Sequence, residues 1–125
     1  MRRFKLLIID DDQAVLDFMS RKLGARYELV TTRAPGDAAA LAREHRPDVI
    51  VCDVDMPAVD GGDISAALYA DDETRDIPLL FLTALVSPED LKQRQGQVGG
   101  RPAVSKSAPL DELVAGIDAL AKARP

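Results

Sequence analysis

The chain has 125 residues, 46% of them hydrophobic, which fits a single domain over residues 1–125 with a buried core. It carries 21 acidic and 16 basic side chains, for a formal net charge of −5, and its basic residues are scattered. This charge pattern disfavours direct binding to nucleic acid or to a membrane, and the apolar runs are too short to cross a bilayer. The single cysteine, Cys52, cannot form an internal disulfide, so we expect a cytoplasmic protein.

Short apolar runs rich in branched residues alternate with segments whose apolar positions recur at helical spacing. In chain order, the apolar runs predict strands at residues 4–9, 27–31, 49–52, 79–82 and 103–104. The other segments predict helices at residues 12–23, 36–45, 63–70, 87–98 and 110–123. This alternation is typical of a parallel sheet with helices on both faces. We therefore expect an α/β fold, a single doubly wound, flavodoxin-like domain with five helices and five parallel strands in the order 2-1-3-4-5.

Acidic residues follow the first and third predicted strands, whose carboxyl ends meet at the ligand-binding edge of such a sheet. Asp10, Asp11 and Asp12 follow the first strand, and Asp53 and Asp55 follow the third. Two carboxylates about 4 Å apart repel by roughly 4 kcal/mol at an effective dielectric of 20, so a cluster of them raises a pKa or binds a cation. Hard oxygen ligands of this kind favour Mg²⁺.

Each of these aspartates also has a simpler interpretation when it is considered alone. Asp12 is most simply the N-cap of the first predicted helix, Asp10 a loop residue and Asp53 a cap before the next helix. The side chain of Asp55 points either into the cluster or to solvent. The joint placement of Asp10, Asp11 and Asp53 at one edge of the sheet favours the metal site.

Two further polar residues fall at the same edge of the predicted sheet. Thr83 follows the fourth strand and Lys106 follows the fifth, although alone they would be an ordinary strand-end hydroxyl and a surface lysine. Together with the carboxylates they indicate an aspartyl phosphotransfer site, in which Asp53 is the nucleophile that forms an acyl phosphate. Asp10 and Asp11 would hold the metal, and Thr83 and Lys106 would contact the phosphoryl oxygens.

At these residues the sequence resembles the receiver domains of two-component response regulators, over nearly the whole chain. The motifs that carry the resemblance are Leu7-Ile8-Ile9-Asp10-Asp11-Asp12, Pro47-Asp48-Val49-Ile50-Val51-Cys52-Asp53, Met56-Pro57-Ala58-Val59-Asp60-Gly61, Pro78-Leu79-Leu80-Phe81-Leu82-Thr83-Ala84 and Lys106. The resemblance implies that Asp53 is the phosphoacceptor, with Thr83 and Lys106 as its catalytic partners. It implies a Mg²⁺ ion bound directly by Asp11 and by Asp10, either directly or through water. Asp53 and the backbone carbonyl of Asp55 would supply the other protein ligands.

The same resemblance implies partners for the chain. The phosphoryl donor would be a phosphohistidine on a sensor histidine kinase or phosphotransfer protein, or a small acyl phosphate. The face formed by residues 87–123 would bind an output domain or partner protein, or a second copy of the chain in a homodimer. The chain would not be an enzyme beyond its own phosphorylation and dephosphorylation. Two residues depart from the family pattern: Ser107 replaces the usual proline after the lysine, and Ala103 replaces the usual aromatic switch residue.

Two other functions are compatible with parts of the sequence. A degenerate receiver would bind partners without phosphorylation, which the departures at Ala103 and Ser107 favour. A phosphatase with an aspartate nucleophile is the other alternative, because Asp53-Val54-Asp55 is similar to the Asp-x-Asp motif of haloacid dehalogenase-type enzymes. In that family the motif comes before the acidic metal pair, whereas here the pair comes first.

Overall fold

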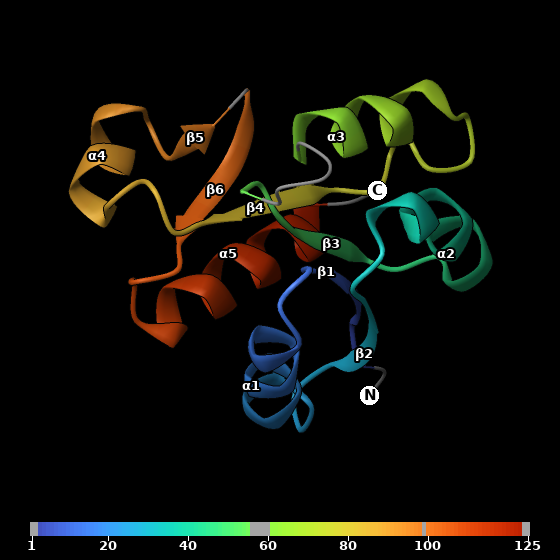
Figure 1. The fold of residues 1–125 in the computed structure, drawn as a ribbon, viewed down its shortest axis with the longest axis horizontal. Coiled ribbons are helices and arrows are strands. Elements are labelled where there is room, and N and C mark those ends of the chain that lie inside the picture. The colour runs from blue at the N-terminus through green and yellow to red at the C-terminus, as the bar shows by residue number, and fades with distance from the viewer. Residues whose placement is uncertain (1–2, 56–60, 99, 124–125) are drawn as a thin grey trace.

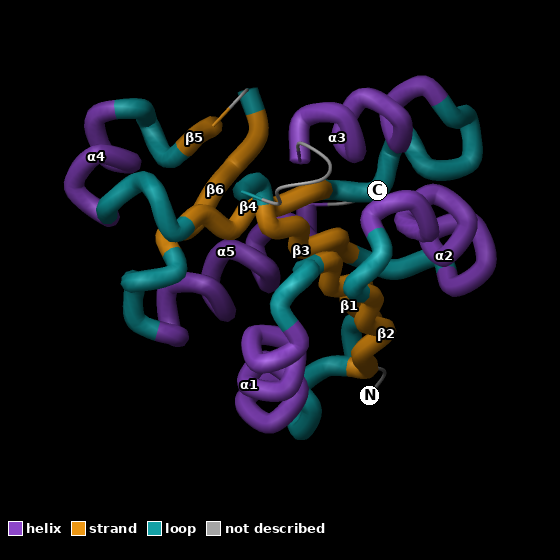
Figure 2. Tube along the Cα trace, viewed as in Figure 1, coloured by secondary structure: helices purple, strands orange, loops and turns teal. Residues whose placement is uncertain are grey.

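The computed structural model describes residues 3–55, 61–98 and 100–123, so residues 56–60 of the Met-Pro-x-x-Asp-Gly motif lie outside the described part of the chain. The strands are β1 (Lys5–Ile9), β2 (Glu28–Thr32), β3 (Val49–Asp53), β4 (Leu79–Thr83), β5 (Gln97–Val98) and β6 (Arg101–Ser105). The helices are α1 (Gln13–Leu23), α2 (Ala38–His45), α3 (Gly61–Ala70), α4 (Pro88–Gln93) and α5 (Leu110–Ala123), with a 3-10 turn η1 (Pro35–Asp37). These elements form the expected doubly wound α/β domain (Figures 1 and 2).

The described strands form one sheet in the order β2-β1-β3-β4-β6-β5. Five of them pair in parallel, so the expected order 2-1-3-4-5 is confirmed with β6 as its fifth strand. The register pairs Ile9 with Cys52, Asp53 with Leu82, and Thr83 with Ser105. The carboxyl ends of β1, β3, β4 and β6 therefore meet at one edge of the sheet.

Helices cover both faces of the sheet, which explains the continuous apolar runs of its strands. Because successive side chains of a strand point to opposite faces, Leu6 and Ile8 lie in one hydrophobic layer and Leu7 and Ile9 in the other. The first layer contains buried residues of α1 and α5, and the second contains buried residues of α2, α3 and α4. In the described part of the chain, no helix combines the length and hydropathy that crossing a bilayer requires.

The predicted helix at residues 87–98 is wrong in its second half, because α4 ends at Gln93. Gln95 and Gly96 have positive φ values of 60° and 72°, which end a right-handed helix. The backbone N–H of Gly96 donates to the carbonyl of Leu91 at 2.7 Å, and that of Gln95 donates to Lys92 at 3.1 Å. This pair of hydrogen bonds is a Schellman cap with Gln95 as its left-handed residue.

An additional strand follows that cap and was not predicted. β5 pairs antiparallel with β6, which places Gln97 opposite Pro102 and Val98 opposite Arg101. Pro102 lacks a backbone N–H, and it is tolerated here because β5 and the start of β6 lie at the edge of the sheet. The fifth parallel strand therefore starts at Arg101 rather than at the predicted residue 103.

Candidate functional site

Asp10, Asp11 and Asp53 form the cluster of carboxylates that the sequence predicts. Asp10 directly follows β1 and Asp53 ends β3, and these two residues are only 1% and 4% exposed. Asp11 is partly exposed. One oxygen from each carboxylate lies within 4.8 Å of the other two, an arrangement that could hold a metal ion. Hard oxygen donors on two adjacent strand ends fit Mg²⁺, which usually takes a few protein carboxylates and completes its shell with water and phosphate.

Backbone hydrogen bonds hold the two buried carboxylates in place. The N–H of Asp12 donates to Oδ1 of Asp10 at 2.9 Å, and the N–H of Asp55 donates to Oδ1 of Asp53 at 3.0 Å. In both cases the donor lies two residues further along the chain, so the chain turns in the same way after β1 and after β3. Asp12 itself is the N-cap of α1, as predicted, because its side chain accepts a hydrogen bond from the N–H of Ala14.

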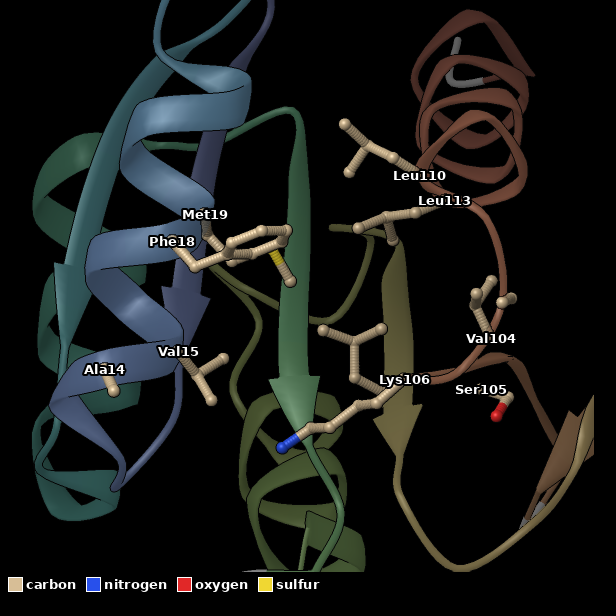
Figure 3. A pocket seen from close by; sticks show the side chains of 11 residues that line it. Ala14, Val15, Phe18, Met19, Val104, Ser105, Lys106, Leu110 and Leu113 are labelled. Atoms are coloured by element: carbon tan, nitrogen blue, oxygen red, sulfur yellow. The ribbon is translucent and has the colours of Figure 1, made fainter.

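Lys106 brings a positive charge to the cluster from the far side of β4. Its Nζ donates to Oδ2 of Asp10 at 3.0 Å and lies 3.4 Å from Oδ1 of Asp53. Figure 3 shows the side chain reaching from the end of β6 toward the end of β3. Its methylene groups border an apolar cavity of about 320 Å³ between α1 and α5, so the stem lies in apolar surroundings and the ammonium lies at the carboxylates.

The loop after β6 explains how Lys106 reaches the cluster although Ser107 follows it. The described residues contain no cis peptide bond. The backbone N–H of Lys106 donates to the carbonyl of Thr83 at 2.7 Å, and the N–H of Ser107 donates to the hydroxyl of Ser105 at 3.2 Å. The hydroxyls of Ser105 and Ser107 are also hydrogen-bonded to each other at 2.8 Å. This role of Ser105 was not predicted, although the Ser-Lys-Ser pattern around Lys106 indicates it.

The ionisation of the site reflects burial and charge pairing. Burial raises the pKa of Asp10, and the charge of Asp53 raises it further, against the opposing effects of the Asp12 N–H and Lys106. Burial lowers the pKa of Lys106, but its hydrogen bond to Asp10 and the two carboxylate charges outweigh burial, so the pKa lies above its usual value. Lys106 is therefore charged at neutral pH. Burial and the neighbouring carboxylates raise the pKa of Cys52 to about 12, which suits a packing residue rather than a nucleophile.

Thr83 and Asp55 lie beside the cluster and contact each other. Thr83 ends β4 and is 1% exposed. Its hydroxyl donates to Oδ2 of Asp55 at 3.1 Å, and the same oxygen accepts a hydrogen bond from the N–H of Ala84 at 2.9 Å. The side chain of Asp55 thus points toward the end of β4. Among the described residues, the group of carboxylates close enough for a metal contains Asp10, Asp11 and Asp53. The predicted role of the Asp55 backbone carbonyl as a ligand remains a prediction.

Comparison with known proteins agrees with this geometry. The sequence model of the response regulator receiver domain matches residues 6–118. The polar-differentiation response regulator DivK of Brucella anthropi is 35% identical over 102 residues, which cover 81% of this chain and 82% of DivK. A similar structure is that of the Vibrio cholerae chemotaxis protein CheY4, with 30% identity and a TM-score of 0.78, covering 94% of this chain and 98% of CheY4.

Some relatives are longer than this chain. The protein named DNA-binding dual master transcriptional regulator RpaA, from Synechocystis, is 36% identical over 117 residues. That match covers 93% of this chain but only 48% of RpaA, so the chain spans about half the length of this relative.

Proposed function

The chain belongs to the family of response regulator receiver domains, which act in phosphorylation-dependent signalling, and we propose that its switch is a phosphoryl group on Asp53. The observation that carries this proposal is the position of Lys106. Its Nζ lies 3.0 Å from Oδ2 of Asp10 and 3.4 Å from Oδ1 of Asp53, where the carboxyl ends of β1 and β3 meet. Asp53 is a buried carboxylate in the position of a nucleophile, and Lys106 lies where its positive charge would offset the negative charge of a phosphoryl group on Asp53.

The chemistry follows from the placement of these groups. An oxygen of Asp53 attacks the phosphorus of the donor, a new O–P bond forms, and the bond from phosphorus to the donor's leaving atom breaks. Lys106 would offset the negative charge that builds up on the phosphoryl oxygens, and the hydroxyl of Thr83, at the end of the neighbouring strand β4, would donate to one of them once it leaves Asp55. We propose that Asp10, Asp11 and Asp53, with the backbone carbonyl of Asp55, bind Mg²⁺. The ion would reduce the repulsion between the carboxylates and the phosphoryl group.

We propose a phosphohistidine of a sensor kinase or phosphotransfer protein as the physiological donor, and a cytoplasmic location for the exchange. The proposed domain spans residues 1–125. We assign the output to residues 87–123, where α4 and β5 lie beside β6 at one edge of the sheet and α5 packs against β6 and β3 on one face (Figure 1). That edge would bind an output domain or partner protein, or a second copy of the chain. We propose no turnover of an external substrate.

Incubation with acetyl phosphate and Mg²⁺ tests this proposal. We expect the intact mass of the protein to increase by one phosphoryl group, and Asp53→Asn to abolish the increase. Asp12→Asn is the matched control, because Asp12 lies in the same acidic run but its carboxylate caps α1. A protein that gains no phosphoryl group would instead be a phosphorylation-independent binding module. Rapid multiple turnover of a phosphoester would indicate a phosphatase.

A further inference from the structure

The carboxylate of Asp55 is bound to the end of β4 in this structure. Its Oδ2 accepts a hydrogen bond from the hydroxyl of Thr83 at 3.1 Å and one from the N–H of Ala84 at 2.9 Å. The N–H of Leu85 in turn donates to Oγ1 of Thr83 at 3.1 Å. One carboxylate therefore fixes both the side chain that ends β4 and the first amide of the loop that leads to α4.

This arrangement uses the single proton of the Thr83 hydroxyl. A hydroxyl has one donor hydrogen, and that hydrogen bond to Asp55 is charge-assisted and hence stronger than a neutral one. The hydroxyl cannot donate to a phosphoryl group on Asp53 until it leaves Asp55. We propose that Asp55 is a positioning residue that acts as an autoinhibitory latch, holding Thr83 and the loop after β4 in the unphosphorylated arrangement.

Phosphorylation of Asp53 would release the latch in two ways. The phosphoryl oxygens compete with Asp55 for the hydroxyl of Thr83, and a phosphoryl group adds about −1.5 to −2 charges beside the Asp55 carboxylate. The two aspartates are adjacent, because the N–H of Asp55 donates to Oδ1 of Asp53 at 3.0 Å. One oxygen of Asp55, Oδ2, accepts the hydrogen bonds of both the Thr83 hydroxyl and the Ala84 N–H. When the Asp55 carboxylate moves away from Thr83, the N–H of Ala84 therefore loses its acceptor as well. The change thus passes to residues 84–87 and to α4, whose N-cap is Ser87.

The latch rests on the proposed function, because it regulates the same site. Its test uses beryllofluoride with Mg²⁺ as a phosphoryl mimic, titrated against the whole chain and followed by amide NMR. We expect Asp55→Ala to increase the affinity for beryllofluoride about tenfold, because binding no longer has to break a charge-assisted hydrogen bond. If Asp55 had only a structural role, its loss would leave the affinity unchanged or lower it.

The same Asp55→Ala substitution made in a Thr83→Val chain distinguishes release of the latch from simple removal of a negative charge. Thr83→Val keeps the shape of the side chain but removes the hydroxyl for which Asp55 and the phosphoryl mimic compete. We expect Asp55→Ala to change the affinity by less than about threefold in this background, because the two residues are coupled. Removal of charge alone would give the same factor in both backgrounds, and that result would overturn the latch. Asp72→Ala, at an exposed aspartate paired with Arg75, is the matched control for charge and should not change the affinity.

Amide exchange in the free protein gives an independent measurement. We expect the N–H of Ala84 to exchange roughly tenfold faster in Asp55→Ala than in the unchanged chain, because that N–H loses its carboxylate acceptor. Equal exchange rates would overturn the latch. A chain that binds no beryllofluoride and accepts no phosphoryl group would instead contradict the proposed function, so the two failures are distinguishable.

Discussion

Lys106 is the positive charge beside two buried carboxylates, those of Asp10 and Asp53. Oxygens of Asp10 and Asp53 lie within 4.8 Å of each other, which corresponds to a repulsion of roughly 3.5 kcal/mol at an effective dielectric of 20. Lys106→Met keeps an apolar stem beside the cavity but removes the charge. Since loss of one member of a buried ion pair costs about 3–5 kcal/mol and Lys106 is 24% exposed, we expect a loss of about 3 kcal/mol in the free energy of unfolding at pH 7 without Mg²⁺.

Urea unfolding with and without Mg²⁺ measures this effect. Burial already holds the pKa of Asp10 above 3.8, and loss of Lys106 raises it further. Protonation of Asp10 removes the repulsion, so the difference in stability between the variant and the unchanged chain should shrink as the pH falls from 7 toward that raised pKa. Mg²⁺ should also stabilise the variant more than the unchanged chain. Lys92→Met, at an exposed lysine of α4, is the control. A Lys106→Met protein with unchanged stability and pH dependence would refute the electrostatic role of Lys106.

Two further predictions concern single carboxylates. Asp11→Asn should weaken Mg²⁺ binding at least about tenfold in a calorimetric titration, because a neutral amide replaces a carboxylate of the cluster, whereas Asp12→Asn should not; equal affinities would contradict the ligand assignment. Asp118→Ala should lower the free energy of unfolding by about 1–2 kcal/mol at pH 7, because it removes the acceptor of the hydrogen bond that the buried hydroxyl of Tyr27 donates to Asp118 at 2.7 Å. Burial raises the pKa of Asp118, but hydrogen bonds from Tyr27 and Arg26 hold it below 3.8, so this stabilisation is present above pH 3.8 and is lost as the pH falls through the lower value. Thermal melts at pH 7 and at a series of pH values below 3.8 check this, and a pH-independent difference would contradict it.

The parallel order and the acidic cluster were predictable from the sequence because they follow from local patterns and one topological rule. Apolar runs that end in Asp10 and Asp53 predict strands, and the doubly wound order places their carboxyl ends together. Lys106 and Thr83 are placed at the same edge by the same rule. The cap of α1 by Asp12 depends only on neighbouring residues, and it was predictable for that reason.

Other features depend on contacts that no local pattern contains. The end of α4 depends on Gln95 adopting a left-handed conformation, for which glycine is the usual sequence signal. β5 is only two residues long and exists because β6 lies beside it. The orientation of Asp55 was open between the cluster and solvent. It is decided by hydrogen bonds to Thr83 and Ala84, which lie 28 and 29 residues further along the chain.

The most direct test of the central proposal identifies the residue that carries the phosphoryl group. Borohydride reduces an aspartyl phosphate to homoserine, which peptide mass spectrometry locates in the chain. After incubation with acetyl phosphate, we expect homoserine at position 53 in the presence of Mg²⁺ and far less of it when the metal is chelated. Homoserine at Asp10, Asp11 or Asp55, or at no position in a protein that remains folded, would contradict the assignment of Asp53 as the phosphoacceptor.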